Sequence, residues 1–250
     1  MSVKSVAKHN ERELGLNTRT IAAEMEEKYP YEEFARAAVS HLLKYDAAMS
    51  EMKVRFEIID KDLQVRSSRN PIHHIESRLK SASSMYEKII RYGYEPTMEN
   101  VEKYMMDIAG IRIITSYIED VYRMVDLLKS QDDLAIIEVK DYIARPKPNG
   151  YRSLHVIVCI PVYFMDSKQM IPVEVQIRTI AMDFWASLEH DLKYKAIGNV
   201  QGVDSYDELK ECSSIIEDVE RRMQVLASAL DEKVAIEPMG DVCMLHCPVV

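Results

Sequence analysis

The sequence predicts an α/β or α+β protein in which a mixed β-sheet of about five strands is flanked by helices. Three observations predict this fold class. A long segment near the start has apolar residues at steps of three and four, which is typical of a helix with one buried face. Beyond Asn70-Pro71 the pattern changes to strands that alternate with helices. At 250 residues, with 47% hydrophobic and 29% charged residues, the chain is long enough to bury one such core.

Two helices are expected before the strands begin. Asn17 can cap a helix that runs to about Lys28 and is ended by Pro30. A long helix follows from about Tyr31 to Arg66. Its expected buried face consists of Phe34, Ala38, Leu42, Tyr45, Met49, Met52, Phe56 and Ile59. A helix packed on its own core is favoured over a regulatory or oligomer surface.

The remaining elements follow from alternation, capping residues and turn formers. The strand over Ile72–Lys80 places Glu76, Arg78 and Lys80 on one face. Further strands are expected at 110–115, 134–144, 154–164 and 170–178, with a hairpin turn at 166–169. Helices are expected at 83–92, from a Thr97 cap to 106, and at 119–130, 179–195 and 206–233. The order of the strands in the sheet does not follow from these patterns.

Composition excludes several classes of protein. A net charge of −9 argues against an electrostatic nucleic-acid binder. No apolar run approaches the roughly 18–20 residues needed to cross a bilayer, and the polar start lacks a signal-peptide core. The scattered Cys159, Cys212, Cys243 and Cys247 suggest reduced thiols in a cytoplasmic protein. Cys243, His246 and Cys247 could bind a metal, but no second ligand pair supports them, so a loose tail is favoured.

The stretch from Val173 to Thr179 is the most informative. Its period of two sends three aliphatic residues inward and exposes Glu174, Gln176 and Arg178 on the opposite face. A solvated sheet face would give the same alternation. Neighbouring strand ends and a glycine-bearing loop, however, supply further cationic or imidazole side chains: Arg78, Lys80, Arg112, Lys140, Lys147 and His155. A basic patch on an otherwise acidic chain suits phosphate groups.

Two carboxylates and one aromatic ring fit the same chemistry. Asp107 and Glu174 could hold a Mg²⁺ ion that bridges phosphates, because such an ion takes one or two protein carboxylates. A capping or turn role is the competing interpretation for Asp107. Tyr151 follows the turn formers Asn149-Gly150, where its ring can stack on a base or cover the core of its own loop.

Six segments in this order resemble the synthetase domain of the Rel/SpoT-type (p)ppGpp synthetases, the alarmone synthetases. They are SerArgLeuLysSer (77–81) with Ser84 and Lys88, AspIleAlaGlyIleArg (107–112), LysAspTyrIle (140–143), LysProAsnGlyTyrArgSerLeuHis (147–155), GluValGlnIleArgThr (174–179) and TrpAlaSerLeuGluHisAspLeuLysTyrLys (185–195). Each segment alone is weak evidence, whereas all six in register are specific. They cover about residues 72–195, roughly half of the chain.

The resemblance implies a nucleotidyltransferase-like synthetase domain at 71–196, with a helical extension at 1–70 and a C-terminal helix and tail at 197–250. About 70 residues precede the matching region and about 55 follow it, too few for the hydrolase and regulatory domains of bifunctional relatives. His190-Asp191 spells a hydrolase dipeptide but has no partner motif, so a structural role is expected. The chain is therefore similar to the small, single-domain alarmone synthetases.

The resemblance also implies a reaction and a role for each site residue. Pyrophosphate passes from ATP to the ribose 3′-hydroxyl of GDP or GTP, giving ppGpp or pppGpp and AMP. Asp107 and Glu174 hold Mg²⁺, and Glu174 also takes the hydroxyl proton. Arg78 and Arg112 sandwich adenine. The ATP phosphates are surrounded by Lys80, Ser84, Lys88, Lys140 and Lys147, while Tyr151 stacks on guanine and Asn149, His155 and Gln176 orient the acceptor nucleotide.

Other functions remain open at this stage. A catalytically weak nucleotide- or RNA-binding regulator would keep the pocket without turnover, although both carboxylates and Tyr151 are present. A nucleotidyltransferase would release pyrophosphate in place of AMP. Family analogy further implies a homotetramer, allosteric control and single-stranded RNA as a partner. The preference among GMP, GDP and GTP does not follow from the sequence.

Overall fold

A computed structural model describes residues 28–66, 69–195 and 205–236. Its centre is a five-stranded mixed sheet with the order β1-β2-β5-β4-β3. The strands are β1 (Ile72–Leu79), β2 (Ala109–Thr115), β3 (Ala135–Asp141), β4 (Leu154–Tyr163) and β5 (Lys168–Thr179). The central pair β2 and β5 is parallel, and the other neighbouring pairs are antiparallel. The predicted fold class, a mixed sheet of about five strands with flanking helices, is confirmed.

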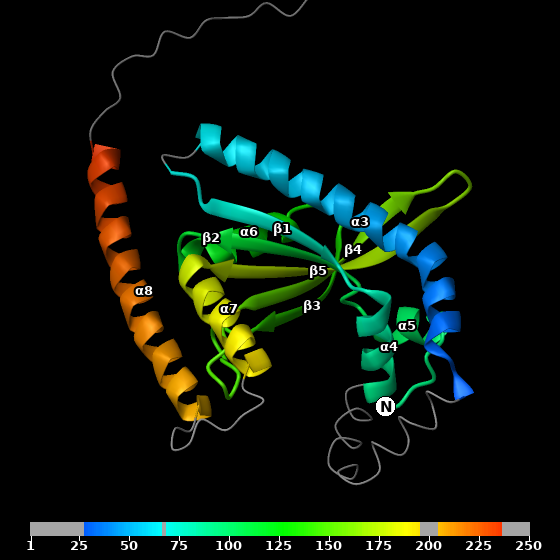
Figure 1. The fold of residues 1–250 in the computed structure, drawn as a ribbon. Helices are drawn as coiled ribbons and strands as arrows, with labels where there is room; N and C mark the ends of the chain where they lie inside the picture. The colour runs from blue at the N-terminus through cyan, green and yellow to red at the C-terminus, as the bar shows by residue number, and fades with distance from the viewer. Residues whose placement is uncertain (1–27, 67–68, 196–204, 237–250) are drawn as a thin grey trace, which may run out of the picture.

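The long helix α3 (Tyr31–Arg66) crosses one side of this sheet (Figure 1). Its buried side chains are Phe34, Ala38, Tyr45, Ala48, Met52, Phe56 and Leu63. They share one hydrophobic core with the inward residues Val173, Val175 and Ile177 of β5 and with the buried side chains of α6 (Ile118–Lys129). The predicted bounds of α3 and five of the eight residues of its predicted buried face are therefore confirmed, whereas Leu42, Met49 and Ile59 are partly buried against the same core. Helix α3 is part of the core rather than an appendage.

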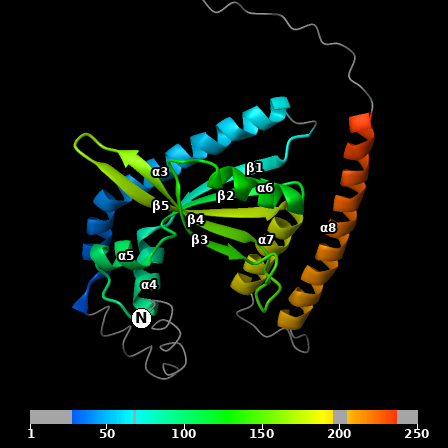
Figure 2. The ribbon, with the colours of Figure 1, turned by 180° about the vertical axis from the view of Figure 1, so that it is seen from behind.

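The remaining helices lie at the two ends of the sheet (Figures 1 and 2). Helices α4 (Ala82–Arg91) and α5 (Met98–Tyr104) lie at the end from which the β4–β5 hairpin projects. Helices α7 (Ile180–Lys195) and α8 (Ser205–Ile236) lie at the opposite end. Ser81 and the predicted Thr97 cap α4 and α5 by accepting hydrogen bonds from backbone N–H groups.

The strand register gathers alternate side chains on the side of the sheet opposite α3, which we call the polar face. Arg78 lies opposite Gly110, and Gly110 lies opposite Glu174 in the next strand. Further along, Arg112 pairs with Gln176, and His155 of β4 pairs with the same glutamine. Because paired residues point to the same side of a sheet, the polar positions of four strands converge on one surface.

Several predicted element bounds differ from the structure by one to three residues, and two of the differences have a clear local cause. Strand β3 ends at Asp141 rather than at 144, because the Asp141 Oδ1 accepts hydrogen bonds from the backbone N–H of Ile143 and Ala144 and turns the chain. The β4–β5 turn is tighter than predicted and closes with the Phe164 N–H donating to the Ser167 carbonyl, so that β5 begins at Lys168.

Some expectations fall outside the described residues. They are the helix predicted at 17–28, apart from its last residue, and the tail with Cys243, His246 and Cys247. Within the described ranges, no helix is long and apolar enough to cross a membrane. Cys159 and Cys212, the cysteines in those ranges, are free thiols.

Candidate active site

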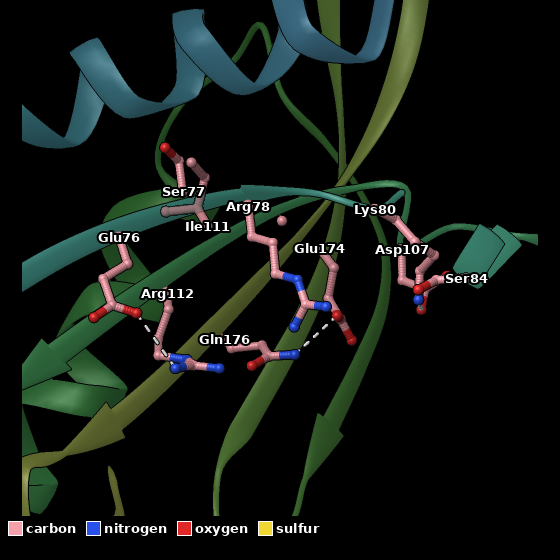
Figure 3. Close-up of a pocket in the computed structure, with 11 residues that line it drawn as sticks. Glu76, Ser77, Arg78, Lys80, Ser84, Asp107, Ile111, Arg112, Glu174 and Gln176 are labelled. Atoms are coloured by element: carbon pink, nitrogen blue, oxygen red, sulfur yellow. Dashed lines mark hydrogen bonds and ion pairs between the residues drawn. The ribbon is translucent and has the colours of Figure 1, made fainter. Parts of the chain in front are cut away.

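A cavity of about 430 Å³ opens on the polar face, and we call it the carboxylate cavity (Figure 3). Seven of the predicted site residues line it: Arg78, Lys80, Ser84, Asp107, Arg112, Glu174 and Gln176. Gly110 lies between Arg78 and Glu174 in the register and forms part of the cavity lining. Without a side chain, Gly110 leaves the space between these two residues open.

Asp107 is neutralised by two lysines. Its Oδ2 lies 2.9 Å from the Lys80 Nζ and 2.5 Å from the Lys88 Nζ. Burial raises the pKa of Asp107, but the hydrogen bonds and charges of the two lysines outweigh burial and hold it below its ordinary value. The other oxygen, Oδ1, is buried and has no hydrogen-bond partner. Asp107 is therefore ionised and retains one free ligand atom.

Glu174 projects from the middle of β5 into the same cavity (Figure 3). Its Oε1 lies 3.0 Å from the His155 Nδ1, and its Oε2 accepts a hydrogen bond of 2.9 Å from the Gln176 side chain. Burial raises the pKa of Glu174 and the nearby charge of Asp107 also raises it, yet the contacts with His155 and Gln176 lower it overall. Asp107 and Glu174 are thus both charged at neutral pH.

The pair Asp107 and Glu174 fits a divalent cation. The orphaned Asp107 Oδ1 supplies an unsatisfied oxygen, and Glu174 adds a second carboxylate in the same cavity. Among the described residues there is no cluster of three or more His, Cys, Asp or Glu side chains that could enclose a metal. A hard cation such as Mg²⁺, which takes only one or two carboxylates and completes its shell with water and substrate phosphates, suits this donor set.

Two arginines extend from neighbouring strands into the carboxylate cavity. Arg78 on β1 is exposed. The Arg112 Nη1 on β2 lies 3.3 Å from the Glu76 Oε2 and 3.8 Å from the Asp183 Oδ1. Figure 3 shows both guanidinium groups on the same side of the sheet as Glu174. Planar cations placed in this way can stack on the faces of a base.

A chain of hydrogen bonds leads away from Glu174 along the polar face. Since a carboxylate only accepts, the His155 Nδ1 donates to Glu174, and in the neutral imidazole the His155 Nε2 then accepts from the Tyr151 hydroxyl at 2.8 Å. The Tyr151 oxygen in turn accepts from the Arg178 Nη2 at 2.7 Å. The base-stacking candidate Tyr151 is therefore held in place by its hydroxyl group.

The remaining predicted residues lie beside this chain rather than in the carboxylate cavity. The Lys147 Nζ sits 4.6 Å from the centre of the Tyr151 ring and 4.7 Å from that of Tyr142. Lys140 on β3 pairs with Glu138 at 2.8 Å and lies opposite His155 in the register. The Asn149 Nδ2 donates to the Glu189 Oε1 at 2.8 Å, and its Oδ1 accepts from the Tyr151 N–H. The site thus consists of two adjoining parts.

Three side chains that organise the site were given no role from the sequence. Arg178 is 6% exposed and bridges Tyr151 to Asp183 at 3.1 Å. Glu76 and Asp183 neutralise Arg112. The alternation that places Glu174 and Gln176 on the polar face also places Arg178 there. In β1, the same alternation places Glu76 beside Arg78 on that face. Nothing in the sequence marked Asp183.

Residues 77–199 match the family described as a region found in RelA / SpoT proteins. The GTP pyrophosphokinase YwaC of Bacillus subtilis (strain 168) is 43% identical over 192 residues, which cover 77% of this chain and 91% of YwaC. YjbM of the same organism, also named a GTP pyrophosphokinase, is 35% identical over 159 residues, 64% of this chain and 74% of YjbM. The chain belongs to the RelA/SpoT family.

Solved structures narrow the relationship within that family. Small alarmone synthetase 1 of Bacillus subtilis, bound to its product pppGpp, superimposes with a TM-score of 0.69 at 31% identity, covering 76% of this chain and 96% of that one. Small alarmone synthetase 2 of the same organism gives a TM-score of 0.68 at 42% identity, with 76% and 97% coverage. The predicted resemblance to small alarmone synthetases is confirmed.

Proposed function

We propose that this protein is a GTP pyrophosphokinase that transfers the pyrophosphate of ATP to the ribose 3′-hydroxyl of GDP or GTP. The products are AMP and ppGpp or pppGpp. The observation that supports this most is the shared cavity of Asp107 and Glu174, surrounded by cations and adjoining Tyr151. The relatives named GTP pyrophosphokinases, and the small alarmone synthetase 1 structures with pppGpp and with AMPCPP, support the same reaction.

The carboxylate cavity is the proposed donor site. Arg78 and Arg112 hold the adenine of ATP between them, and Lys80, Ser84 and Lys88 take its phosphates. Because both lysines contact Asp107 in the free protein, incoming phosphates draw the lysines away and release the carboxylate. Asp107 and Glu174 would then hold Mg²⁺, which when bound neutralises charge on the transferring phosphates.

The chain from Glu174 to Tyr151 is the proposed acceptor site. The Tyr151 ring stacks on guanine, and Asn149, His155 and Gln176 orient the nucleotide. Lys140 and Lys147, the other two predicted ligands of the ATP phosphates, lie beside this chain. Glu174 accepts the proton of the attacking 3′-hydroxyl. Its lowered pKa keeps the carboxylate ionised, so that it can receive this proton. The new bond forms to the β-phosphorus of ATP as the bond to the α-phosphate oxygen breaks, and AMP leaves.

The experiment that tests this function is product analysis. Purified protein is incubated with ATP, Mg²⁺ and GMP, GDP or GTP in turn, and the nucleotides are separated by anion exchange. We expect AMP and a guanosine product carrying two additional phosphates in equal amounts, and neither product when the metal is chelated. Release of pyrophosphate would indicate a nucleotidyltransferase instead, and nucleotide binding without any product would indicate a regulator.

The assembly of the protein is part of the same proposal. Helix α7 exposes Ile180, Phe184, Leu188 and Leu192 at steps of four residues, and α8 exposes Ile215, Val219, Met223 and Leu226. Such apolar stripes support a homo-oligomer, and we expect a tetramer by light scattering. A cytoplasmic location is supported by the free thiols of Cys159 and Cys212. Single-stranded RNA is a secondary partner, and its retention should fall steeply with salt.

A further inference from the structure

The loop of residues 147–153, which we call the Tyr151 loop, is shaped by helix α8. Gly150 is buried at the centre of the loop with a φ of +89°, a conformation that favours glycine. A Cβ atom at this position would lie 2.8 Å from the Ser213 Cβ and 3.2 Å from the Lys210 Cα. Helix α8 therefore packs directly against the loop backbone.

Ser213 joins the two segments by a hydrogen bond. Its hydroxyl donates to the Gly150 carbonyl at 2.6 Å, and the side chain is almost completely buried. A serine inside a helix commonly bonds to the carbonyl four residues earlier in its own helix, as Ser228 bonds to the Gln224 carbonyl. Ser213 instead satisfies a carbonyl of the loop that carries Tyr151.

Neighbouring loop residues are also tied to α7 and α8. The Arg152 Nη1 lies 3.1 Å from the Glu220 Oε2, and both side chains are 4% exposed. Asn149 donates to Glu189 of α7. The Trp185 indole N–H of α7 donates to the Leu209 carbonyl of α8 at 2.9 Å, which joins the two helices. Residues 149, 150 and 152 are thus each held from outside the loop.

We propose that Ser213 is a positioning residue for the guanine nucleotide, and that α8 is a structural part of the acceptor site. This inference rests on the proposed function, in which Tyr151 stacks on guanine. Ser213 lies beyond the matched RelA/SpoT region at 77–199. By fixing Gly150, it sets where the next residue, Tyr151, leaves the loop and meets Arg178 and His155. The residues that line the carboxylate cavity include none from the Tyr151 loop, α7 or α8.

The test compares Ser213→Ala with Ser214→Ala, which alters an exposed serine next to it on α8. Titration calorimetry measures GDP and a non-hydrolysable ATP analogue separately, and kinetics give KM for each substrate. We expect Ser213→Ala to weaken GDP binding and raise KM for GDP about fivefold, the value of one neutral hydrogen bond. The ATP-analogue affinity should stay unchanged, and Ser214→Ala should match the wild type for both ligands.

Two results would overturn the inference. One is unchanged GDP affinity in Ser213→Ala. The other is an equal loss of affinity for GDP and for the ATP analogue, which would show that Ser213 supports the whole fold and not the acceptor site. A wild-type protein that binds no guanine nucleotide would instead overturn the proposed function, so the two failures are distinguishable.

Discussion

The two parts of the site are stabilised in different ways. In the donor part, the lysines of the cavity are paired with a carboxylate that the proposed reaction needs, since Lys80 and Lys88 both contact Asp107. In the acceptor part, Tyr151 is fixed by neutral and charged hydrogen bonds to His155 and Arg178, and its loop is held by α7 and α8. We therefore expect the proposed donor part to rearrange its charges on binding, whereas the proposed acceptor part is already held by hydrogen bonds in the free protein.

Glu174 links these two parts. It lines the carboxylate cavity, yet its two oxygens contact His155 and Gln176 on the acceptor side. A residue at this boundary is suited to accept a proton from a hydroxyl held on one side while it contributes a metal ligand on the other. The difference between the parts predicts that substitutions should separate donor from acceptor effects.

The largest effect is expected from Asp107→Asn. It removes the charge from the donor part while keeping the size of the side chain, so we expect kcat to fall about 10²–10³-fold. GDP affinity should stay unchanged, because the acceptor contacts do not involve Asp107. Initial rates of AMP formation and calorimetry with GDP measure the two quantities.

Asp126→Asn, on the exposed side of α6, is the control for Asp107→Asn and should behave as the wild type. An Asp107→Asn enzyme with near-normal kcat would remove the metal assignment.

The next effect concerns the stability of the acceptor part. Glu220→Gln leaves the Arg152 guanidinium buried without its ionic partner, so we expect the free energy of unfolding to fall by about 3 kcal/mol. This value is at the lower end of the destabilisation usual for a broken buried ion pair, because neither Glu220 oxygen makes a well-aligned hydrogen bond despite the 3.1 Å contact. Urea denaturation followed by circular dichroism measures the change.

Glu217→Gln is a matched control for Glu220→Gln, since Glu217 pairs with Arg221 on the exposed surface of the same helix. Its effect should be at most about 0.5 kcal/mol. Equal destabilisation by the two substitutions would contradict a specific buried pair.

Tyr151→Phe separates the ring from its hydroxyl group. It keeps the stacking surface and removes the bonds to Arg178 and His155, so KM for GDP should rise about tenfold with little change for ATP. Tyr151→Ala should lose considerably more, because stacking on the base is lost as well.

Steady-state kinetics with each substrate varied in turn test the Tyr151 prediction. Tyr163→Phe at the exposed β4–β5 hairpin serves as the control. An unchanged KM for GDP in Tyr151→Phe would mean that the hydroxyl network does not position the ring.

The last effect, similar in size to that of Tyr151→Phe, concerns metal binding by the free protein. Lys80→Met removes one of the two cations that contact Asp107, so Mn²⁺, used in place of Mg²⁺, should bind about tenfold more tightly without nucleotide. In the wild type, a non-hydrolysable ATP analogue should raise Mn²⁺ affinity. Electron paramagnetic resonance counts free Mn²⁺, with Lys61→Met on the exposed side of α3 as the control. Mn²⁺ affinity that is unaffected by Lys80→Met would refute lysine competition.

Local patterns predicted most of the fold. The steps of three and four in Phe34–Phe56 determined the buried face of α3, and the alternation around Glu174 determined which side chains of β5 reach the polar face. Strand order could not be predicted, because it depends on pairing between segments far apart in the chain. The parallel contact of β2 with β5 is such a case.

Residue types with known chemistry predicted which side chains gather in the cavity, whereas contacts that depend on packing alone could not be predicted. The cavity brings together Asp107, Glu174 and their predicted cationic neighbours. In the sequence, Ser213 cannot be told apart from other small residues of an amphipathic helix. Only the close packing of α8 against Gly150 in the structure shows its role. The pairing of Lys80 and Lys88 with Asp107 was not predicted either, because the family resemblance assigned the lysines to the ATP phosphates and Asp107 to the metal.

Transfer of a labelled phosphate tests the central claim most directly. ATP labelled at its β-phosphate is incubated with GDP, Mg²⁺ and the protein, and the guanosine product is then cleaved specifically at its 3′-position. We predict that the label is recovered in the group attached to the 3′-oxygen while unlabelled AMP accumulates in equal amount. Label found only in ADP, free phosphate or free pyrophosphate would contradict the account.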